Sequence, residues 1–271
     1  MKIFVVNLRR EPEKKERFKL AWKGIEGDLE FIEAVDGSLL DENELQKLVY
    51  SYPQIKLTKG EIGCALSHLS IYQRIVKSKI PIALILEDDA IPGGDSGISK
   101  MNVFLKEIEF HCRGMKNAVL FLQKCFYDCS TNKEKINVSK GLTFYKLNSR
   151  EYTWYTHGYI VTYGAAKKLR DFILPIRYEA DCWKAFMIGA NIKVWACSPH
   201  IVENSDKDRR FSSLEFERRK TIRERRKVRK VLIEREIELR EARERARIFP
   251  LNRFIKRKFA GLLSLLFGNK R

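Results

Sequence analysis

Apolar residues recur along the chain in two patterns, short continuous runs and helical spacing, and the two patterns alternate. The clearest run, residues 82–86, holds five apolar residues together, which is typical of a strand buried on both faces of a sheet. Shorter runs predict further strands at 2–8, 29–35, 118–123, 141–147, 156–163 and 192–197. Helical patterns predict helices at 12–23, 41–50, 101–112, 164–174 and 179–189, and 124–140 reads as polar and irregular. This alternation indicates the α/β fold class.

A capping box marks the start of another helix before the apolar run. Thr58 is followed three residues later by Glu61, and the apolar positions after it keep helical spacing. His68 lies within this helix, where a histidine serves either as a structural residue or as a ligand. Pro81 ends the helical pattern and leads into the apolar run.

Three carboxylates, Glu87, Asp88 and Asp89, follow the apolar run directly. Ligands bind outside the carboxyl ends of the strands in open α/β sheets, so these acids are expected where a substrate lies. Adjacent carboxylates repel one another unless a cation neutralises them, and their hard oxygen atoms suit Mg²⁺ or Mn²⁺. The alternative is that they only solvate a strand end or cap the next helix.

Composition narrows the class of protein. The chain has 271 residues, of which 44% are hydrophobic, enough for one full domain with an appendage. Its six cysteines form no C-x-x-C pair, so we expect reduced thiols in a cytosolic protein and no zinc site. We expect neither a signal peptide nor a membrane span, since no apolar run reaches the required length. Phosphate-binding loops, the G-x-S-x-G turn and the H-E-x-x-H helix are absent from the sequence.

The net charge of +18 is concentrated in the C-terminal part. Residues 206–271 hold 23 Lys and Arg against 10 Asp and Glu. We therefore divide the chain into a catalytic domain at 1–205, a long charged helix at 206–247 and a basic amphipathic helix at 248–271. A partial apolar seam in the long helix favours either a coiled coil, and so a homo-oligomer, or packing against the domain. The last helix is expected to lie on an anionic membrane surface, or else to dock on the domain itself.

Several short motifs occur in a fixed order across the first 205 residues. They are FVVNLRR at 4–10, AVDG at 34–37, GEIGCALSH at 60–68, LILEDDA at 84–90, GY at 158–159 with GAA at 164–166, and DCW at 181–183. In this order they resemble glycosyltransferase family 25, which includes lipooligosaccharide galactosyltransferases of Gram-negative bacteria and animal collagen galactosyltransferases. The resemblance implies a GT-A type fold with a mostly parallel sheet, a UDP-sugar donor such as UDP-galactose, and inversion at the anomeric carbon.

The resemblance also implies roles for particular residues. Asp88 and Asp89 are expected to hold Mn²⁺ or Mg²⁺. His200 is a candidate third ligand because of its place at the end of the last predicted strand, not because of the resemblance. Asp181 is expected to act as the general base, with Glu179 as the second candidate; the alternative for Asp181 is a charge at a helix N-terminus. The candidates for binding the donor are Asn7, Arg9, Arg10, Asp36, Glu61, Ser67, His68, Glu87 and Asp88. For the two arginines, contact with the pyrophosphate and simple solvation both stay open.

The leading interpretation is an inverting, metal-dependent β-galactosyltransferase. It would transfer a hexose from a UDP-sugar to a lipooligosaccharide or lipopolysaccharide core acceptor, as a peripheral protein on the cytoplasmic face of the bacterial inner membrane. One alternative is a nucleic-acid-binding protein that uses the basic helix, although nothing in that helix resembles a base-reading motif, so we expect no nucleic-acid partner. The other is a metal-dependent phosphohydrolase, which would explain the acidic strand end but not the segment at 60–68.

Overall fold

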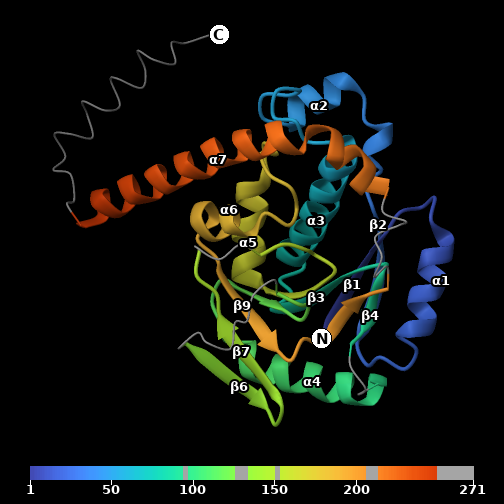
Figure 1. The fold of residues 1–271 in the computed structure, drawn as a ribbon. Helices are drawn as coiled ribbons and strands as arrows, with labels where there is room; N and C mark the ends of the chain where they lie inside the picture. Colours follow the sequence, from blue (N-terminus) through green and yellow to red (C-terminus); the bar gives the residue numbers. More distant parts are fainter. Residues whose placement is uncertain (94–96, 126–133, 150–152, 206–212, 249–271) are drawn as a thin grey trace.

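A mixed sheet forms the centre of the molecule (Figure 1). The computed structural model describes residues 1–93, 97–125, 134–149, 153–205 and 213–248. Among these, eight strands pair in the order β2-β1-β3-β8-β5-β9-β7-β6, and β4 pairs with β10 separately. The strands are β1 Lys2–Asn7, β2 Asp28–Glu33, β3 Ile82–Glu87, β4 Ala90–Pro92, β5 Ala118–Phe121, β6 Lys135–Ser139, β7 Leu142–Lys146, β8 Gly158–Thr162, β9 Lys193–Ser198 and β10 Val202–Asn204. The predicted α/β class is confirmed.

Helices cover both faces of this sheet. They are α1 Pro12–Ala21, α2 Glu42–Leu48, α3 Lys59–Lys77, α4 Gly97–Cys112, α5 Tyr163–Ile173, α6 Trp183–Ala185 and α7 Ser213–Ile248, with short turns η1 Gly37–Leu39 and η3 Phe186–Ala190. One hydrophobic cluster packs α3, α5, η3 and part of α7 against one face, and a second packs α1 and α4 against the other. Strand β3 contributes alternate residues to both clusters, as its continuous apolar run predicts.

Strand β3 lies between β1 and β8 in the sheet. It is parallel to β1 and antiparallel to β8. The carboxyl ends of β1, β2 and β3 therefore meet at one edge, and the acidic residues 87–89 lie there. The neighbouring β4 and β10 pair beyond this edge, so the chain segment at 202–204 returns to the same place.

Two predicted segments differ from the structure. Residues 135–139, inside the segment predicted as irregular, form β6, an edge strand whose pattern is weak because only Val138 is buried. Residues 179–189 were predicted as one helix, but the helix begins only at Trp183 and continues as a π turn. Residues before it form a turn in which the Cys182 N–H donates to the Glu179 carbonyl at 3.1 Å. The buried position of the Glu179 side chain, described below, holds this turn out of the helix.

Two glycines allow the loop after β2 to contact the start of α3. A Cβ on Gly63 would lie 2.6 Å from the Val35 carbonyl oxygen, and one on Gly37 would lie 1.7 Å from the Lys59 carbonyl oxygen. Any larger residue at either place would push the helix away from the loop. This contact explains physically why glycine occurs in both the AVDG and the GEIGCALSH motifs.

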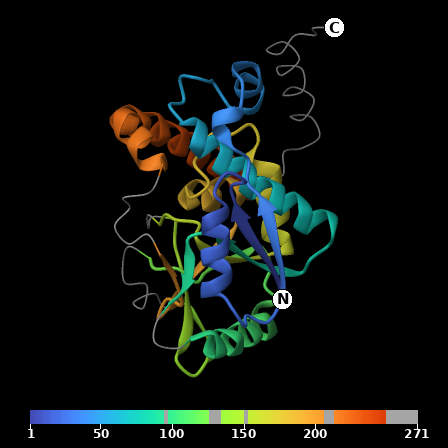
Figure 2. The ribbon, with the colours of Figure 1, turned by 90° about the vertical axis from the view of Figure 1, so that its right-hand side faces the viewer.

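Helix α7 packs against the domain along its described inner face. Ile233 is buried, and Val228 and Leu232 pack against the same hydrophobic cluster. Both views place α7 beside α2 and α3, with α4 at the opposite end of the molecule (Figures 1 and 2). Of the two alternatives for the long helix, the structure thus has packing against the domain. In the part of the chain described, every helix is too short or too polar to cross a membrane.

Candidate active site

The acidic motif 87–89 lies at the carboxyl end of β3, next to the carboxyl end of β1. The register pairs Val6 with Glu87, which brings Asn7 beside Asp88. The Asn7 Nδ2 donates to Asp88 Oδ2 at 2.7 Å and to the Glu11 carbonyl at 3.1 Å. Two strands that are distant in sequence therefore bring a predicted donor-binding residue and the acidic motif together, at the sheet edge where ligands bind.

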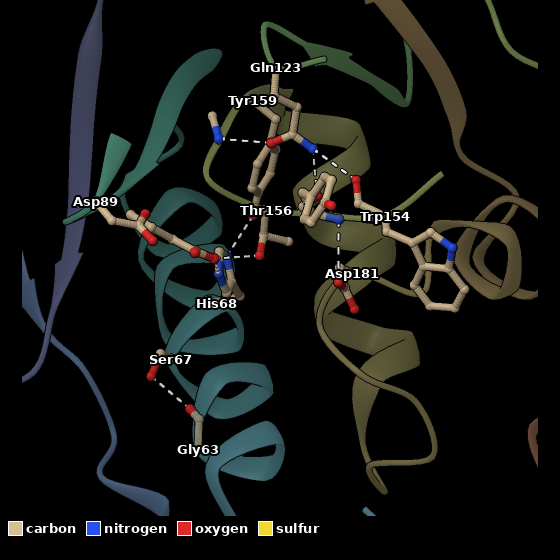
Figure 3. Close-up of polar contacts among 12 residues, drawn as sticks. Gly63, Ser67, His68, Asp89, Gln123, Trp154, Thr156, Tyr159 and Asp181 are labelled. Carbon is tan, nitrogen blue, oxygen red and sulfur yellow. Dashed lines mark hydrogen bonds and ion pairs between the residues drawn. The ribbon is translucent and has the colours of Figure 1, made fainter. Parts of the chain in front are cut away.

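Glu87 joins a chain of hydrogen bonds that includes His68 of α3. Its other members, Thr156 and Tyr159, lie near His68 in Figure 3. The Glu87 Oε1 lies 3.4 Å from His68 Nε2 and accepts a short hydrogen bond from the Thr156 hydroxyl. The other ring nitrogen of His68 lies 2.8 Å from the Tyr159 hydroxyl, which lies 2.6 Å from the Tyr72 hydroxyl. Burial alone would raise the pKa of Glu87, but the contact with His68 outweighs it and holds the pKa below its usual value.

Asp88 and Asp89 are less well compensated than Glu87. Burial, together with the charge of Glu87, raises the pKa of Asp88 to about 6 and that of Asp89 to about 7. Asn7 opposes the rise at Asp88, and Asn204 opposes it at Asp89. The ionised forms of both side chains are therefore unfavourable in the folded chain unless a positive charge joins them.

The contacts of the Asp89 carboxylate indicate where a cation could bind. Its Oδ2 accepts a hydrogen bond from Asn204 Nδ2 at 2.8 Å, but its buried Oδ1 has no hydrogen-bond partner within the described part of the chain. A buried carboxylate oxygen without a partner, beside a second raised-pKa carboxylate, matches the ligand preference of Mg²⁺ or Mn²⁺. Lys14 of α1 lies near enough to lower the pKa of both aspartates, but its amino group is paired with Glu11.

His200, the predicted third ligand, lies close to this edge but contacts a different acid. Its Nε2 is 3.8 Å from Glu203 Oε1. His200 also lies near His157. The pKa of His157 is below its usual value because burial and the charge of His200 lower it more than the charge of Glu87 raises it. The structure therefore brings His157, His200 and Glu87 into one neighbourhood, while the role of His200 as a metal ligand stays a prediction.

Arg9 and Arg10, the predicted phosphate-binding arginines, lie in the loop that follows β1. Arg9 is exposed in the turn after β1. Arg10 is ion-paired with Asp36 and donates to the Ser38 hydroxyl at 3.1 Å. Hydrogen bonds from Ser38, followed by the charge of Arg10, hold the pKa of Asp36 below its usual value despite desolvation. Arg10 and Asp36 thus form one polar group beside the site, and their contact with the donor stays a prediction.

The predicted base Asp181 lies on a loop that is fixed from two sides (Figure 3). Its Oδ2 accepts a hydrogen bond from the Tyr155 N–H at 3.3 Å. The Tyr155 carbonyl in turn accepts from Gln123 Nε2 at 2.6 Å and from Trp183 Nε1 at 2.9 Å. Asp181 is only partly buried, so an acceptor hydroxyl can approach it.

The second candidate base, Glu179, is held in a buried group of charges that we call the arginine cluster: Glu61, Glu179, Arg225 and Arg229. Arg225 lies 2.5 Å from Glu61 and 3.3 Å from Glu179, and Arg229 lies 2.9 Å from Glu179. Both acids are less than 5% exposed. The Arg229 guanidinium also covers the Trp154 ring at 4.4 Å. Glu179 is thus enclosed by cations from α7, which favours Asp181 as the base.

Ser67 and Glu61, both predicted to bind the donor, have structural partners. The Ser67 hydroxyl donates to the Gly63 carbonyl at 2.7 Å and accepts from the Val35 N–H at 2.8 Å, which fastens α3 to the loop after β2 (Figure 3). Glu61 completes the predicted capping box with Thr58, as well as binding Arg225. Their contact with a donor stays a prediction.

The comparison with protein families decides the identity of the domain. The model of "Glycosyltransferase family 25 (LPS biosynthesis protein)" matches residues 1–183, which is more than half of the chain. The chain belongs to glycosyltransferase family 25. The resemblance inferred from the sequence motifs is therefore confirmed, and the acidic motif, α3 and the Asp181 loop all lie within the matched region.

Curated relatives of this family 25 domain include animal and viral proteins. The chain is 23% identical over 222 residues to human procollagen galactosyltransferase 2, covering 74% of this chain and 34% of the relative. It is 26% identical over 234 residues to procollagen lysyl hydroxylase and glycosyltransferase of Acanthamoeba polyphaga mimivirus, covering 74% and 24%. It is 25% identical over 225 residues to mouse inactive glycosyltransferase 25 family member 3, covering 73% and 36%. The chain thus spans about a third of the length of these relatives or less.

Sequence reasoning missed several residues of this family 25 site. Asn204 and Lys14 reach the acidic motif from β10 and α1, and no local pattern marks either of them. Arg225 and Arg229 stood in a run of similar charges, so nothing distinguished them from their solvated neighbours. His157 had one usable signal, since it lies within the predicted strand 156–163, two residues before Tyr159.

Proposed function

We propose that this family 25 protein is an inverting glycosyltransferase that transfers galactose from UDP-galactose to the core sugar of a lipooligosaccharide. Membership of the family supports glycosyl transfer from a nucleotide sugar, and the galactosyltransferase names of relatives support the choice of sugar. The observation that carries the proposal is the Asp89 carboxylate, whose buried Oδ1 has no partner in the described residues, at the strand end where a donor diphosphate would lie.

Asp88 and Asp89 would hold a divalent cation, Mn²⁺ or Mg²⁺, with His200 as the further predicted ligand. Such a cation supplies Lewis-acid stabilisation of the negative charge that develops on the departing diphosphate. Asn7 keeps the Asp88 carboxylate in place through its 2.7 Å hydrogen bond, and Asn204 does the same for Asp89. These two amides fix the direction in which the carboxylates face the donor.

Asp181 would take the proton from the acceptor hydroxyl as the hydroxyl oxygen forms its bond to the anomeric carbon. The bond between that carbon and the diphosphate oxygen breaks in the same displacement, so the configuration inverts. The hydrogen bond from the Tyr155 N–H to Asp181 Oδ2 holds the carboxylate in place. Gln123 and Trp183 hold the Tyr155 segment and so orient the base.

We further propose that the protein works at the cytoplasmic face of a bacterial inner membrane, where a lipid-linked acceptor would be available. The basic amphipathic segment 248–271 supports this proposal by its sequence, although residues 249–271 lie outside the described part of the chain. A homo-oligomer through the 211–247 helix stays a prediction. It would have to use α7 residues other than Val228 and Leu232, which pack inside the chain.

A donor and acceptor screen tests the function. The purified full chain is incubated with Mn²⁺, a panel of UDP-sugars and truncated lipooligosaccharide cores, and products are read by mass spectrometry and NMR. We expect one added hexose, with the anomeric configuration opposite to that of the donor. Release of phosphate without sugar transfer would favour the phosphohydrolase alternative. Retention on DNA or RNA with no effect of any UDP-sugar on thermal stability would favour the nucleic-acid alternative.

A further inference from the structure

A cysteine, a histidine and a carboxylate meet on the side of the acidic motif that faces α3. Cys64 and His68 are four residues apart on α3, so both project from one face of the helix toward the end of β3. The Cys64 sulfur, a His68 ring nitrogen and a Glu87 carboxylate oxygen all lie within 4.8 Å of one another. This combination of ligands, with cysteine and histidine one helical turn apart, is of the kind that binds zinc in proteins.

The distance between His68 and Glu87 is long for a hydrogen bond, and it is also the distance expected between two ligands of one cation. His68 Nε2 lies 3.4 Å from Glu87 Oε1, whereas hydrogen bonds from N–H to O are usually about 2.9 Å long. Two ligand atoms about 2 Å from one zinc ion in tetrahedral geometry lie about 3.3 Å apart. The observed separation therefore fits the edge of a zinc coordination tetrahedron without movement of either side chain.

Neighbouring hydroxyls complete the environment that a metal site needs. His68 Nδ1 lies 2.8 Å from the Tyr159 hydroxyl, so Nδ1 can donate to that oxygen and leave Nε2 to bind a metal. The Thr156 hydroxyl donates to Glu87 and fixes the carboxylate. Cys64 is only partly buried and the Glu87 side chain is 28% exposed, so an ion can enter from solvent.

We propose that Cys64, His68 and Glu87 form a binding site for a zinc-type divalent cation, separate from the hard-cation site at Asp88 and Asp89. The thiolate and imidazole select a borderline-soft ion over Mg²⁺ or Mn²⁺. Three protein ligands leave a fourth position to water. The bound ion ties α3 to the end of β3 and fixes Glu87 beside the proposed donor site. The site is independent of the proposed function, because it requires no donor and no acceptor.

Cobalt titration of the full chain tests the site, since Co²⁺ replaces Zn²⁺ and reports a thiolate ligand by a near-ultraviolet charge-transfer band. Protein freed of metal with a chelator should give this band with a one-to-one end point, and Zn²⁺ should abolish it. Cys64→Ser should lose the band, and His68→Gln should weaken Co²⁺ binding at least tenfold. Tyr159→Phe, which removes the partner of the ring, should weaken it about 10- to 100-fold.

Two control variants separate this site from others in the chain. Cys125→Ser changes another partly buried thiol and should keep the band, and Asp89→Ala removes the hard-cation site and should keep it too. The proposal is overturned if Co²⁺ binds without a thiolate band, or if Cys64→Ser keeps it, or if Asp89→Ala abolishes it. Should Cys64→Ser fail to fold, alkylation of the wild-type chain decides the matter. Zn²⁺ should then protect Cys64, and not Cys125, from iodoacetamide in peptide mass spectra.

Discussion

Two groups of carboxylates in this domain, one buried and one partly buried, differ in how their charge is balanced. In the arginine cluster, Glu61 and Glu179 face Arg225 and Arg229 at distances of 2.5 to 3.3 Å. In the acidic motif, Asp88 and Asp89 receive hydrogen bonds from neutral amides of Asn7 and Asn204, and the nearby Lys14 is paired with Glu11. Among the described residues, the first group is ion-paired with its own arginines, whereas Asp88 and Asp89 have no ion-pair partner.

This difference distinguishes carboxylates that stabilise the fold from carboxylates that are available to bind a cation. Buried ion pairs that satisfy one another fasten elements together, and removing one partner leaves an uncompensated charge. Carboxylates left with raised pKa values, about 6 for Asp88 and about 7 for Asp89, gain from any cation that arrives with a ligand. The arginine cluster therefore attaches α7 to the domain, while the acidic motif is suited to hold a metal with a diphosphate.

The largest expected effect comes from the acidic motif. Asp89→Ala should lower sugar transfer by about three orders of magnitude or more, since it removes a metal ligand that stabilises the departing diphosphate. The measurement is initial transfer rate at saturating UDP-galactose and Mn²⁺, together with the circular dichroism spectrum. Glu33→Ala, which removes an exposed acid at the end of β2, two strands from β3 in the sheet, should transfer normally. Near-normal turnover in Asp89→Ala would contradict the metal assignment.

Removing a charge from the arginine cluster should lower the stability of the protein. Arg225→Met should lower the free energy of unfolding by about 3–5 kcal/mol, because it leaves Glu61 and Glu179 buried with fewer partners. Urea unfolding followed by tryptophan fluorescence measures the change. Arg226→Met alters the exposed neighbour on the same helix and should stay within about 0.5 kcal/mol of the wild type. Equal stability of the two variants would mean that α7 does not depend on the cluster.

Substitutions of the two candidate bases should have different effects, on turnover for Asp181 and on stability for Glu179. Asp181→Asn should keep donor binding and lose about a hundredfold in turnover, the usual scale for a general base. Glu179→Gln should instead lose stability, since it removes the negative charge that faces the buried Arg225 and the partly buried Arg229. Single-turnover kinetics and thermal melting distinguish the two outcomes, with Asp171→Asn on the surface of α5 as the control. A hundredfold loss of turnover in a fully folded Glu179→Gln would reverse the assignment.

The pH dependence of stability should come from the acidic motif. Asp88 and Asp89 have pKa values of about 6 and 7 in the fold, against about 4 in an unfolded chain, so the folded state binds more protons between these values. Without divalent cations, this contribution to stability is present below pH 4 and is lost as pH rises to about 7. Melting temperatures in EDTA at pH 5 and pH 8 should therefore differ less for Asp89→Asn than for the wild type, by several degrees.

Added Mn²⁺ provides the complementary measurement. It should raise the melting temperature of the wild type more at pH 8 than at pH 5, because protons compete with the cation for the same oxygens. Asp89→Asn should show a much smaller response at either pH. If the wild type and Asp89→Asn have the same pH profile in EDTA, the raised pKa values are assigned to the wrong group.

The smallest effect on catalysis should come from the end of the chain. Truncation after Arg247 should abolish binding to anionic vesicles and change transfer to a soluble acceptor by less than about twofold. The reason is that apolar side chains and nearby basic charges in 248–271 supply the surface affinity, at about 1 kcal/mol for each Lys or Arg. Vesicle flotation and soluble assays measure both. Retained flotation would assign membrane binding to α7, and lost activity would show that the tail supports the domain.

Much of the fold could be predicted from the pattern of apolar and polar residues within short segments of the chain. The continuous apolar run of β3, the capping box of α3 and the strands around them were predictable, because burial on one or two faces leaves a period in the sequence. The segment at 179–182 was not, because its conformation depends on a distant partner, α7, that draws Glu179 inward. A different reason hid β6, whose edge position needs only one buried side chain and so leaves almost no pattern.

Some features of the candidate site could likewise be predicted from the sequence, and others depend on the fold. The acidic motif at a strand end and the family could both be predicted from short stretches of sequence, because each depends on residues close together in the chain. Only the tertiary structure decided which charges are balanced, because that depends on pairs such as Asp89 with Asn204 and Glu61 with Arg225, which are more than a hundred residues apart. The cysteine spacing gave no reason to expect zinc, whereas the fold brings Cys64 and His68 to Glu87. Ligand geometry is a property of side chains that meet in space, and linear spacing records it only when they share one element.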